Sequence, residues 1–238
     1  MFNINSLFNE LSINPLYLFD ETDELDYIKT HLLRFKSSIK YIYPILENTN
    51  NLLELGNKTC FCKIINYFFP NIKIDNTTED LRYDFLTNIN NNYDMILCME
   101  TIEHIKDREM EDDISNINNL HLESFVGDGI ESLLRNCYRL LNSTGHLFLT
   151  TPNINGYYNI KKIMSYEHPF GYEPHPRELT YNNIKRFLNK TNFNIKLFDY
   201  IHCWNGLSNE EKQKIDEFGL LFSPEKNRED CIFCLTTK

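Results

Sequence analysis

Hydrophobic side chains recur at two different spacings along this chain, and the two spacings predict two kinds of element. Between residues 24 and 46 the apolar side chains recur every three or four residues, which predicts an amphipathic helix. Farther along, short uninterrupted apolar runs end at glycine, proline or asparagine, which is typical of buried strands. We predict strands at residues 51–55, 72–74, 93–99, 146–151, 195–204 and 230–237.

Segments with helical spacing lie between several of these strands, and we predict helices at residues 60–69, 100–106, 130–141 and 180–189. Strands that alternate with helices indicate βαβ units and a doubly wound, mostly parallel α/β sheet. Ligands of such sheets bind beyond the carboxyl ends of the strands. The strand ends at residues 54–57, 98–100 and 150–153 are therefore the first places to look for a site.

The chain has 238 residues, which suits one domain with an elaboration. Residues 1–48 are predicted to form a helical N-terminal extension, and residues 49–238 the α/β domain. Residues 107–129 are acidic and rich in asparagine, and they contain the only close glycine pair, Gly127-Asp128-Gly129. We predict that this segment is a surface insertion with a turn.

Composition excludes several classes of function. The 8 glycines cannot be assembled into a Gly-x-Gly-x-x-Gly or Walker-type phosphate loop. The net charge of −10 argues against broad binding to nucleic acid, which needs clustered lysine and arginine. Since there is no long apolar run and no secretory signal pattern, we expect a cytoplasmic protein without a membrane span. The 7 cysteines show no disulfide framework, and Cys231 and Cys234 are predicted to be buried thiols in a strand.

Four segments follow one another in a specific order. They are Leu52-Leu53-Glu54-Leu55-Gly56, residues 93–105 with Glu100-Thr101-Ile102-Glu103-His104, residues 134–153, and His175-Pro176-Arg177-Glu178-Leu179-Thr180. In this order they resemble the class I methyltransferases that use S-adenosylmethionine, in particular the small-molecule and glycan branch with an E-x-x-E-H signature. The resemblance covers about residues 50 to 238.

This resemblance implies a Rossmann-like sheet of seven strands whose last strand is antiparallel. It also implies methyl transfer from S-adenosylmethionine to an oxygen, or a nitrogen, of a small molecule or saccharide. The glycine loop departs from the family pattern, because Lys58 and Cys60 stand where the second and third glycines are usual. A side chain at Lys58 either crowds the cofactor or meets its carboxylate. A methyltransferase-like scaffold or partner subunit without catalysis therefore stays open as an alternative, and the oligomeric state does not follow from the sequence.

The resemblance assigns residues to a cofactor site. Glu54, Gly56 and Asn57 form the first loop, and Met99 and Glu100 end the 93–99 strand. An acid that follows the second strand is expected to accept hydrogen bonds from the ribose hydroxyls. Both Asp75 and Asp80 are candidates for that acid, and Asp80 is also a candidate for facing the adenine amino group.

The resemblance also directs two histidines, His104 and His175, toward the methyl acceptor. Glu100, Glu103 and His104 are spaced i, i+3 and i+4, so on a helix they would share one face. His104 is a candidate base, and a structural or cofactor-loop support is the alternative role. The same residues with His175 resemble the metal site of RNA 3′-terminal 2′-O-methyltransferases, so a divalent ion held by Glu100, Glu103, His104 and His175 is an alternative. Aromatic and histidine side chains are expected to wall a substrate pocket, namely Tyr157, Tyr158, Tyr166, His168, Phe170 and Tyr172.

Overall fold

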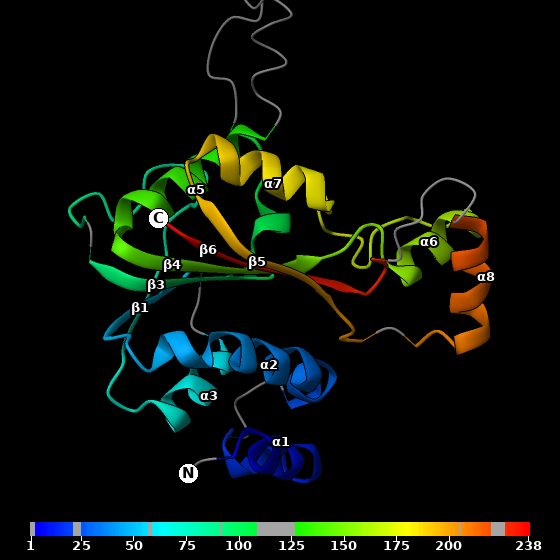
Figure 1. Ribbon diagram of the computed structural model, residues 1–238, viewed down its shortest axis with the longest axis horizontal. Helices are drawn as coiled ribbons and strands as arrows, with labels where there is room; N and C mark the ends of the chain where they lie inside the picture. The colour runs from blue at the N-terminus through cyan, green and yellow to red at the C-terminus, as the bar shows by residue number, and fades with distance from the viewer. Residues whose placement is uncertain are drawn as a thin grey trace, which may run out of the picture.

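The computed structural model describes residues 3–20, 25–56, 59–90, 92–108, 127–204, 206–219 and 227–238. It is an α/β protein with a central sheet between helices (Figure 1). The strands are β1 (Asn51–Glu54), β2 (Lys73–Asn76), β3 (Tyr93–Met99), β4 (Leu141–Pro152), β5 (Asn194–Ile201) and β6 (Cys231–Thr237). The α-helices are α1 (Ile4–Ile13), α2 (Leu25–Leu46), α3 (Cys60–Phe68), α5 (Asp128–Leu140), α6 (Tyr157–Met164), α7 (Tyr181–Lys190) and α8 (Asn209–Gly219), and two 3₁₀ turns are η1 (Pro15–Tyr17) and η2 (Ile102–His104).

The strand order is β2-β1-β3-β4-β6-β5. The pairs from β2 to β4 are parallel, and β6 runs antiparallel to both of its neighbours, β4 and β5. The doubly wound architecture and the antiparallel last strand are therefore confirmed. The described residues form six strands rather than the seven expected, because the asparagine-rich stretch between β2 and β3 forms turns where it is described, as such residues favour.

Helices cover both faces of the sheet. In Figure 1 the α1, α2 and α3 helices lie on one face, and α5 and α7 lie on the other. Each face buries its own hydrophobic cluster, one with Phe35 and Phe61 stacked at 5.6 Å between ring centroids, and the other with Phe187 of α7. The helix predicted at residues 24–46 is α2, and its apolar stripe faces the sheet because burial of that stripe is what stabilises it.

Three local predictions need correction. The helix expected at residues 100–106 is only the single turn η2, which Glu100 precedes with a left-handed φ of +50°. The helices α6 and α8 lie in segments where no helix was predicted, and of α8 only Ile215 and Gly219 are buried, so it has little apolar pattern to detect. The turn expected at Gly127-Asp128-Gly129 is instead the start of α5, at Asp128. Most of the predicted insertion, residues 109–126, lies outside the described residues.

Three further predictions concern a membrane span, the cysteines and the division of the chain. Among the described residues, no helix has both the length and the apolar character that a membrane crossing requires. Cys231 and Cys234 are buried on β6, as the sequence predicted. The division of the chain at residue 48 stays a prediction, and α2 contributes to the same hydrophobic cluster as side chains from β1 and β3.

Candidate active site

A cavity of about 720 Å³ opens at the carboxyl ends of β3 and β4. The fold places it there because the ends of parallel strands leave a crevice at that edge of a doubly wound sheet. The residues that line it come from α2, η2, α6 and the loops after β4 and β5. They are Tyr27, Thr30, His31, Arg34, Glu100, Glu103, His104, Pro152, Asn153, Gly156, Tyr158, Asn159, Gly171, Tyr172, His175, Trp204, Gly206 and Asp230.

The end of β1 is shaped by Glu54, which is 1% exposed. Its carboxylate accepts hydrogen bonds from Thr59 N at 2.8 Å, Thr59 Oγ1 at 2.6 Å and Cys62 Sγ at 2.8 Å. A carboxylate is favourable there because Thr59 is the N-cap of α3 and the first amides of the helix are positive. Glu54 therefore holds the first loop in shape and does not line the cavity.

Gly56 follows β1 in a left-handed conformation with φ +85°, where a residue with a Cβ is strained. Its amide donates to Thr77 Oγ1 at 2.7 Å, which ties the first loop to the segment after β2. A Cβ added to Gly56 would meet no atom of the described residues within 4 Å, so they leave the space in front of this backbone open. Asn57 and Lys58, the next residues of the loop, lie outside the described residues, so the prediction for Asn57 stays a prediction.

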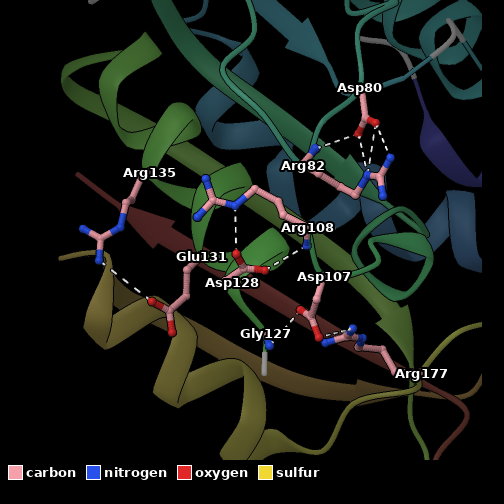
Figure 2. Close-up of polar contacts among 9 residues, drawn as sticks. All are labelled: Asp80, Arg82, Asp107, Arg108, Gly127, Asp128, Glu131, Arg135 and Arg177. Atoms are coloured by element: carbon pink, nitrogen blue, oxygen red, sulfur yellow. Dashed lines mark hydrogen bonds and ion pairs between the residues drawn. The ribbon is translucent and has the colours of Figure 1, made fainter. Parts of the chain in front are cut away.

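The two candidate ribose acids differ in position. Asp75 pairs with Leu53 in the β1–β2 register, close to the first loop, and it accepts from Tyr93 Oη at 3.2 Å and Lys73 Nζ at 3.1 Å. Asp80 lies in the loop after β2 and binds the guanidinium of Arg82 at 2.6 Å, which lowers the pKa of Asp80 (Figure 2). Neither lines the cavity, and Asp75 is the acid nearer to the strand ends.

An ion pair missed by sequence reasoning joins α2 to the end of β3. Arg34 Nη1 lies 3.1 Å from Glu100 Oε2, and the two side chains are only 3% and 14% exposed. The guanidinium also donates to Tyr27 Oη at 2.8 Å, and it lies 5.7 Å from the ring centroid of Trp204. Its Nε is buried without a hydrogen-bond partner in the described part of the chain. In the sequence, Arg34 is only a charged residue at the border of an apolar helix face. This position does not reveal that its partner is Glu100.

Three of the four candidate metal ligands meet in the cavity. One ligand atom each of Glu103, His104 and His175 lies within 4.8 Å of the others, and the two imidazole rings are 4.6 Å apart between centroids. Glu100 is outside this group because its carboxylate is turned toward Arg34. Glu100, Glu103 and His104 do not share a helix face as expected, because the chain forms only the turn η2 here and Glu100 precedes it with a left-handed φ of +50°. Burial and the neighbouring His175 lower the pKa of His104, so its imidazole is neutral at neutral pH.

Glu103 is a fully buried carboxyl group in the cavity wall. Its Oε2 accepts a hydrogen bond from Thr151 Oγ1 at 2.8 Å, and its Oε1 has no partner within the described residues. Burial, together with the charge of Glu100, raises the pKa of Glu103 well above its ordinary value. The carboxyl therefore tends to stay protonated, and it can donate as well as accept a hydrogen bond.

Replacing Glu103 by glutamine should increase the free energy of unfolding at neutral pH. Because its pKa is raised in the folded state, wild-type stability is fully present below the unfolded pKa and is lost as the pH rises through the folded one. Glutamine has no such loss, so its advantage should shrink as the pH falls from neutral towards about 4, and it should stay small below that pH. Urea unfolding of the wild type and of Glu103→Gln, measured from neutral pH to about pH 4, checks the effect. The exposed Glu173→Gln is the control. An advantage that does not change with pH would contradict it.

The predicted aromatic wall is present only in part. Tyr158 and Tyr172 line the cavity, whereas Tyr166 is fully exposed and Tyr157 donates to Asp216 on α8. Three further ring-bearing residues of the cavity lining were missed by the sequence analysis, namely Tyr27, His31 and Trp204. Burial and the nearby Arg34 lower the pKa of His31 to about 4, so this imidazole is neutral too.

These features define the chain as an α/β protein of the class I methyltransferase fold. A family model described as a methyltransferase domain matches residues 29–197, and the chain belongs to this family. A search of curated proteins found no match. Among solved structures, a SAM-dependent methyltransferase from Archaeoglobus fulgidus has a TM-score of 0.54 and 12% identity over 85% of this chain and 92% of its own. A SAM-dependent methyltransferase, possible histamine N-methyltransferase, from Thermotoga maritima has a TM-score of 0.50 and 12% identity over 98% of this chain and 99% of its own. At this identity the two structures show a shared fold.

Proposed function

We propose that this protein transfers a methyl group from S-adenosylmethionine to an oxygen, or a nitrogen, of a small molecule or saccharide. The observation that carries the proposal is the cavity itself, which joins the carboxyl end of β3 to a pair of histidines from separate loops. Its volume suits a small-molecule acceptor. Aromatic side chains in the cavity lining suit a ring, either planar or saccharide.

The residues at the strand ends fit the cofactor. The open space in front of Gly56 allows the backbone to approach it closely, and Glu54 keeps that loop in shape. The Nε of Arg34 is buried and has no hydrogen-bond partner among the described residues. It suits the methionine carboxylate, since guanidinium and carboxylate form strong charge-assisted hydrogen bonds. Asp75 is our choice for the ribose hydroxyls, and Met99 with Glu100 forms the neighbouring strand end.

S-adenosylmethionine supplies an electrophilic methyl carbon, and its sulfur keeps the electron pair of the bond that breaks. The protein mainly has to align the acceptor and exclude water. In this proposal Tyr158, Tyr172 and Trp204, which line the cavity, hold the acceptor ring, and the histidines take a proton from the acceptor. A base accelerates attack by an acceptor hydroxyl more than attack by an amine, because a neutral hydroxyl is the weaker nucleophile until its proton is removed.

Calorimetry with S-adenosylmethionine and with S-adenosylhomocysteine tests the proposal. Saturable binding of both compounds is expected. Absence of binding at millimolar concentration would exclude catalysis and favour the alternative of a scaffold or partner subunit without cofactor. A protein that binds both is then assayed for transfer of a labelled methyl group to hydroxyl- and amine-bearing acceptors.

The metal-dependent RNA-end alternative has its own test. Only three of its four proposed ligands converge, because Glu100 is held by Arg34. We therefore expect no saturable binding of Mn²⁺ in calorimetry. Binding that disappears in the His104→Ala variant would instead favour this alternative.

A further inference from the structure

Glu178 has a buried carboxyl group next to the cavity, and its side chain is 0% exposed. Its Oε2 accepts from Asn159 Nδ2 at 2.6 Å, and its Oε1 accepts from the amide of Gly171 at 2.7 Å. The same Oε1 lies 3.1 Å from Nδ1 of His175. Asn159, Gly171 and His175 all line the cavity, so Glu178 contacts three lining residues without lining the cavity itself.

These contacts determine which nitrogen of His175 carries the proton. An ionised carboxylate only accepts hydrogen bonds, and Gly171 N can only donate, so the shared Oε1 must act as an acceptor. The nitrogen Nδ1 of His175 must therefore donate its hydrogen to Glu178. In a neutral imidazole this leaves the lone pair on Nε2. With Nδ1 engaged by Glu178, Nε2 is the nitrogen left for the group formed with Glu103 and His104.

The loop that carries both residues is also fixed to the turn that carries His104. Arg177 Nη2 lies 3.0 Å from Asp107 Oδ2, and Asp107 Oδ1 accepts from the amide of Gly127 at 2.8 Å. Figure 2 shows Asp107 between Gly127 and Arg177. Asp107 follows η2 by three residues, so this bridge holds the two histidine-bearing loops together.

We propose that Glu178 is a positioning residue, which holds His175 in the tautomer whose Nε2 lone pair accepts the proton of an acceptor hydroxyl. The inference rests on the proposed function for the identity of the reaction. In the proposed reaction the hydroxyl oxygen would form a bond to the methyl carbon while the bond between that carbon and the sulfonium sulfur breaks. The sulfur would keep the electron pair of that bond, and the hydroxyl proton would move to Nε2 of His175. Hydrogen bonds from Asn159 and Gly171 orient the carboxylate of Glu178, in the way that an outer carboxylate orients a histidine base in other enzymes.

The tautomer can be measured directly by ¹⁵N NMR of the imidazole groups in the full-length protein without cofactor. The spectra are recorded at about pH 8.5, where an ordinary imidazole is neutral, and the signals of His175 are assigned by their loss in His175→Gln. The wild type should show His175 with hydrogen on Nδ1. Glu178→Ala should lose this signal and gain one with hydrogen on Nε2. Glu178→Gln should keep the wild-type tautomer, because its amide oxygen still accepts, and the exposed control Glu173→Gln should match the wild type.

Two outcomes would overturn the inference: hydrogen on Nε2 of His175 in the wild type, or hydrogen retained on Nδ1 in Glu178→Ala. If the alanine variant does not fold, the wild-type spectrum alone still decides between the two tautomers. The measurement needs neither cofactor nor acceptor. A failure of S-adenosylmethionine binding in calorimetry is therefore separable from a failure of the positioning role.

Discussion

Replacing Gly56 by valine should abolish S-adenosylmethionine binding. Gly56 has a φ of +85°, which a β-branched residue adopts only with strain of order 1–3 kcal/mol. The valine side chain would also enter the open space in front of the loop, where the proposed cofactor approaches the backbone. A binding loss of about 100-fold or more is expected, since each 1.4 kcal/mol is worth about a factor of ten.

Calorimetry of a matched pair separates the two causes. Asparagine tolerates the left-handed region, so Gly56→Asn should retain most of the wild-type unfolding free energy while its side chain still occupies the open space. Loss of S-adenosylmethionine binding in both variants would show that binding needs the open space in front of Gly56. Loss in Gly56→Val alone would show that binding needs the left-handed conformation of the loop. Unchanged affinity in Gly56→Val would mean that the cofactor does not bind at this loop.

The variant Arg34→Met should lose about 3 kcal/mol of unfolding free energy, a typical cost for removing one partner of a buried ion pair. Glu100 would be left 14% exposed with its closest cation gone. The contacts of the guanidinium with Tyr27 and Trp204 would also be lost. Urea unfolding at neutral pH measures the change.

The double variant Arg34→Met/Glu100→Gln is the main control, because it removes the charge that the single variant leaves behind. It should recover most of the lost stability. Lys214→Met breaks the exposed pair with Glu210 on α8 and should have little effect, since exposed pairs contribute little. A double variant no more stable than Arg34→Met would show that the charge of Glu100 is not the source of the loss.

The local pattern of the sequence predicted the elements that bury most of their residues. Residues 93–99 match β3, and residues 24–46 contain α2, because uninterrupted apolar runs and a 3.6-residue period follow directly from burial. The helix predicted at residues 100–106 was wrong for a different reason, which lies in a tertiary contact. Its spacing fits a helix, but Glu100 is drawn to Arg34 in a left-handed conformation, and the chain keeps only the turn η2.

Ordered motifs located parts of the site, but they did not assign roles to the residues. Glu54 and Gly56 were found from their position after a strand, and the structure shows that Glu54 acts on the loop through Thr59 and Cys62. His104 and His175 were each expected to face the acceptor, and the cavity places their rings together. Asp75 and Asp80 were equivalent in the sequence, and only the β1–β2 register and the bond to Arg82 distinguish them.

The sequence by itself therefore determined the class of fold, the edge of the sheet that holds the site and most of the candidate residues, because periodicity and motif order are local properties of the chain. Only the tertiary structure decided which side chains meet. Arg34 reaches Glu100 from α2, and Glu178 holds His175 with the help of Asn159. Such contacts depend on how the helices and loops pack at the strand ends, and a one-dimensional pattern records whether a side chain is buried but not the partner beside it.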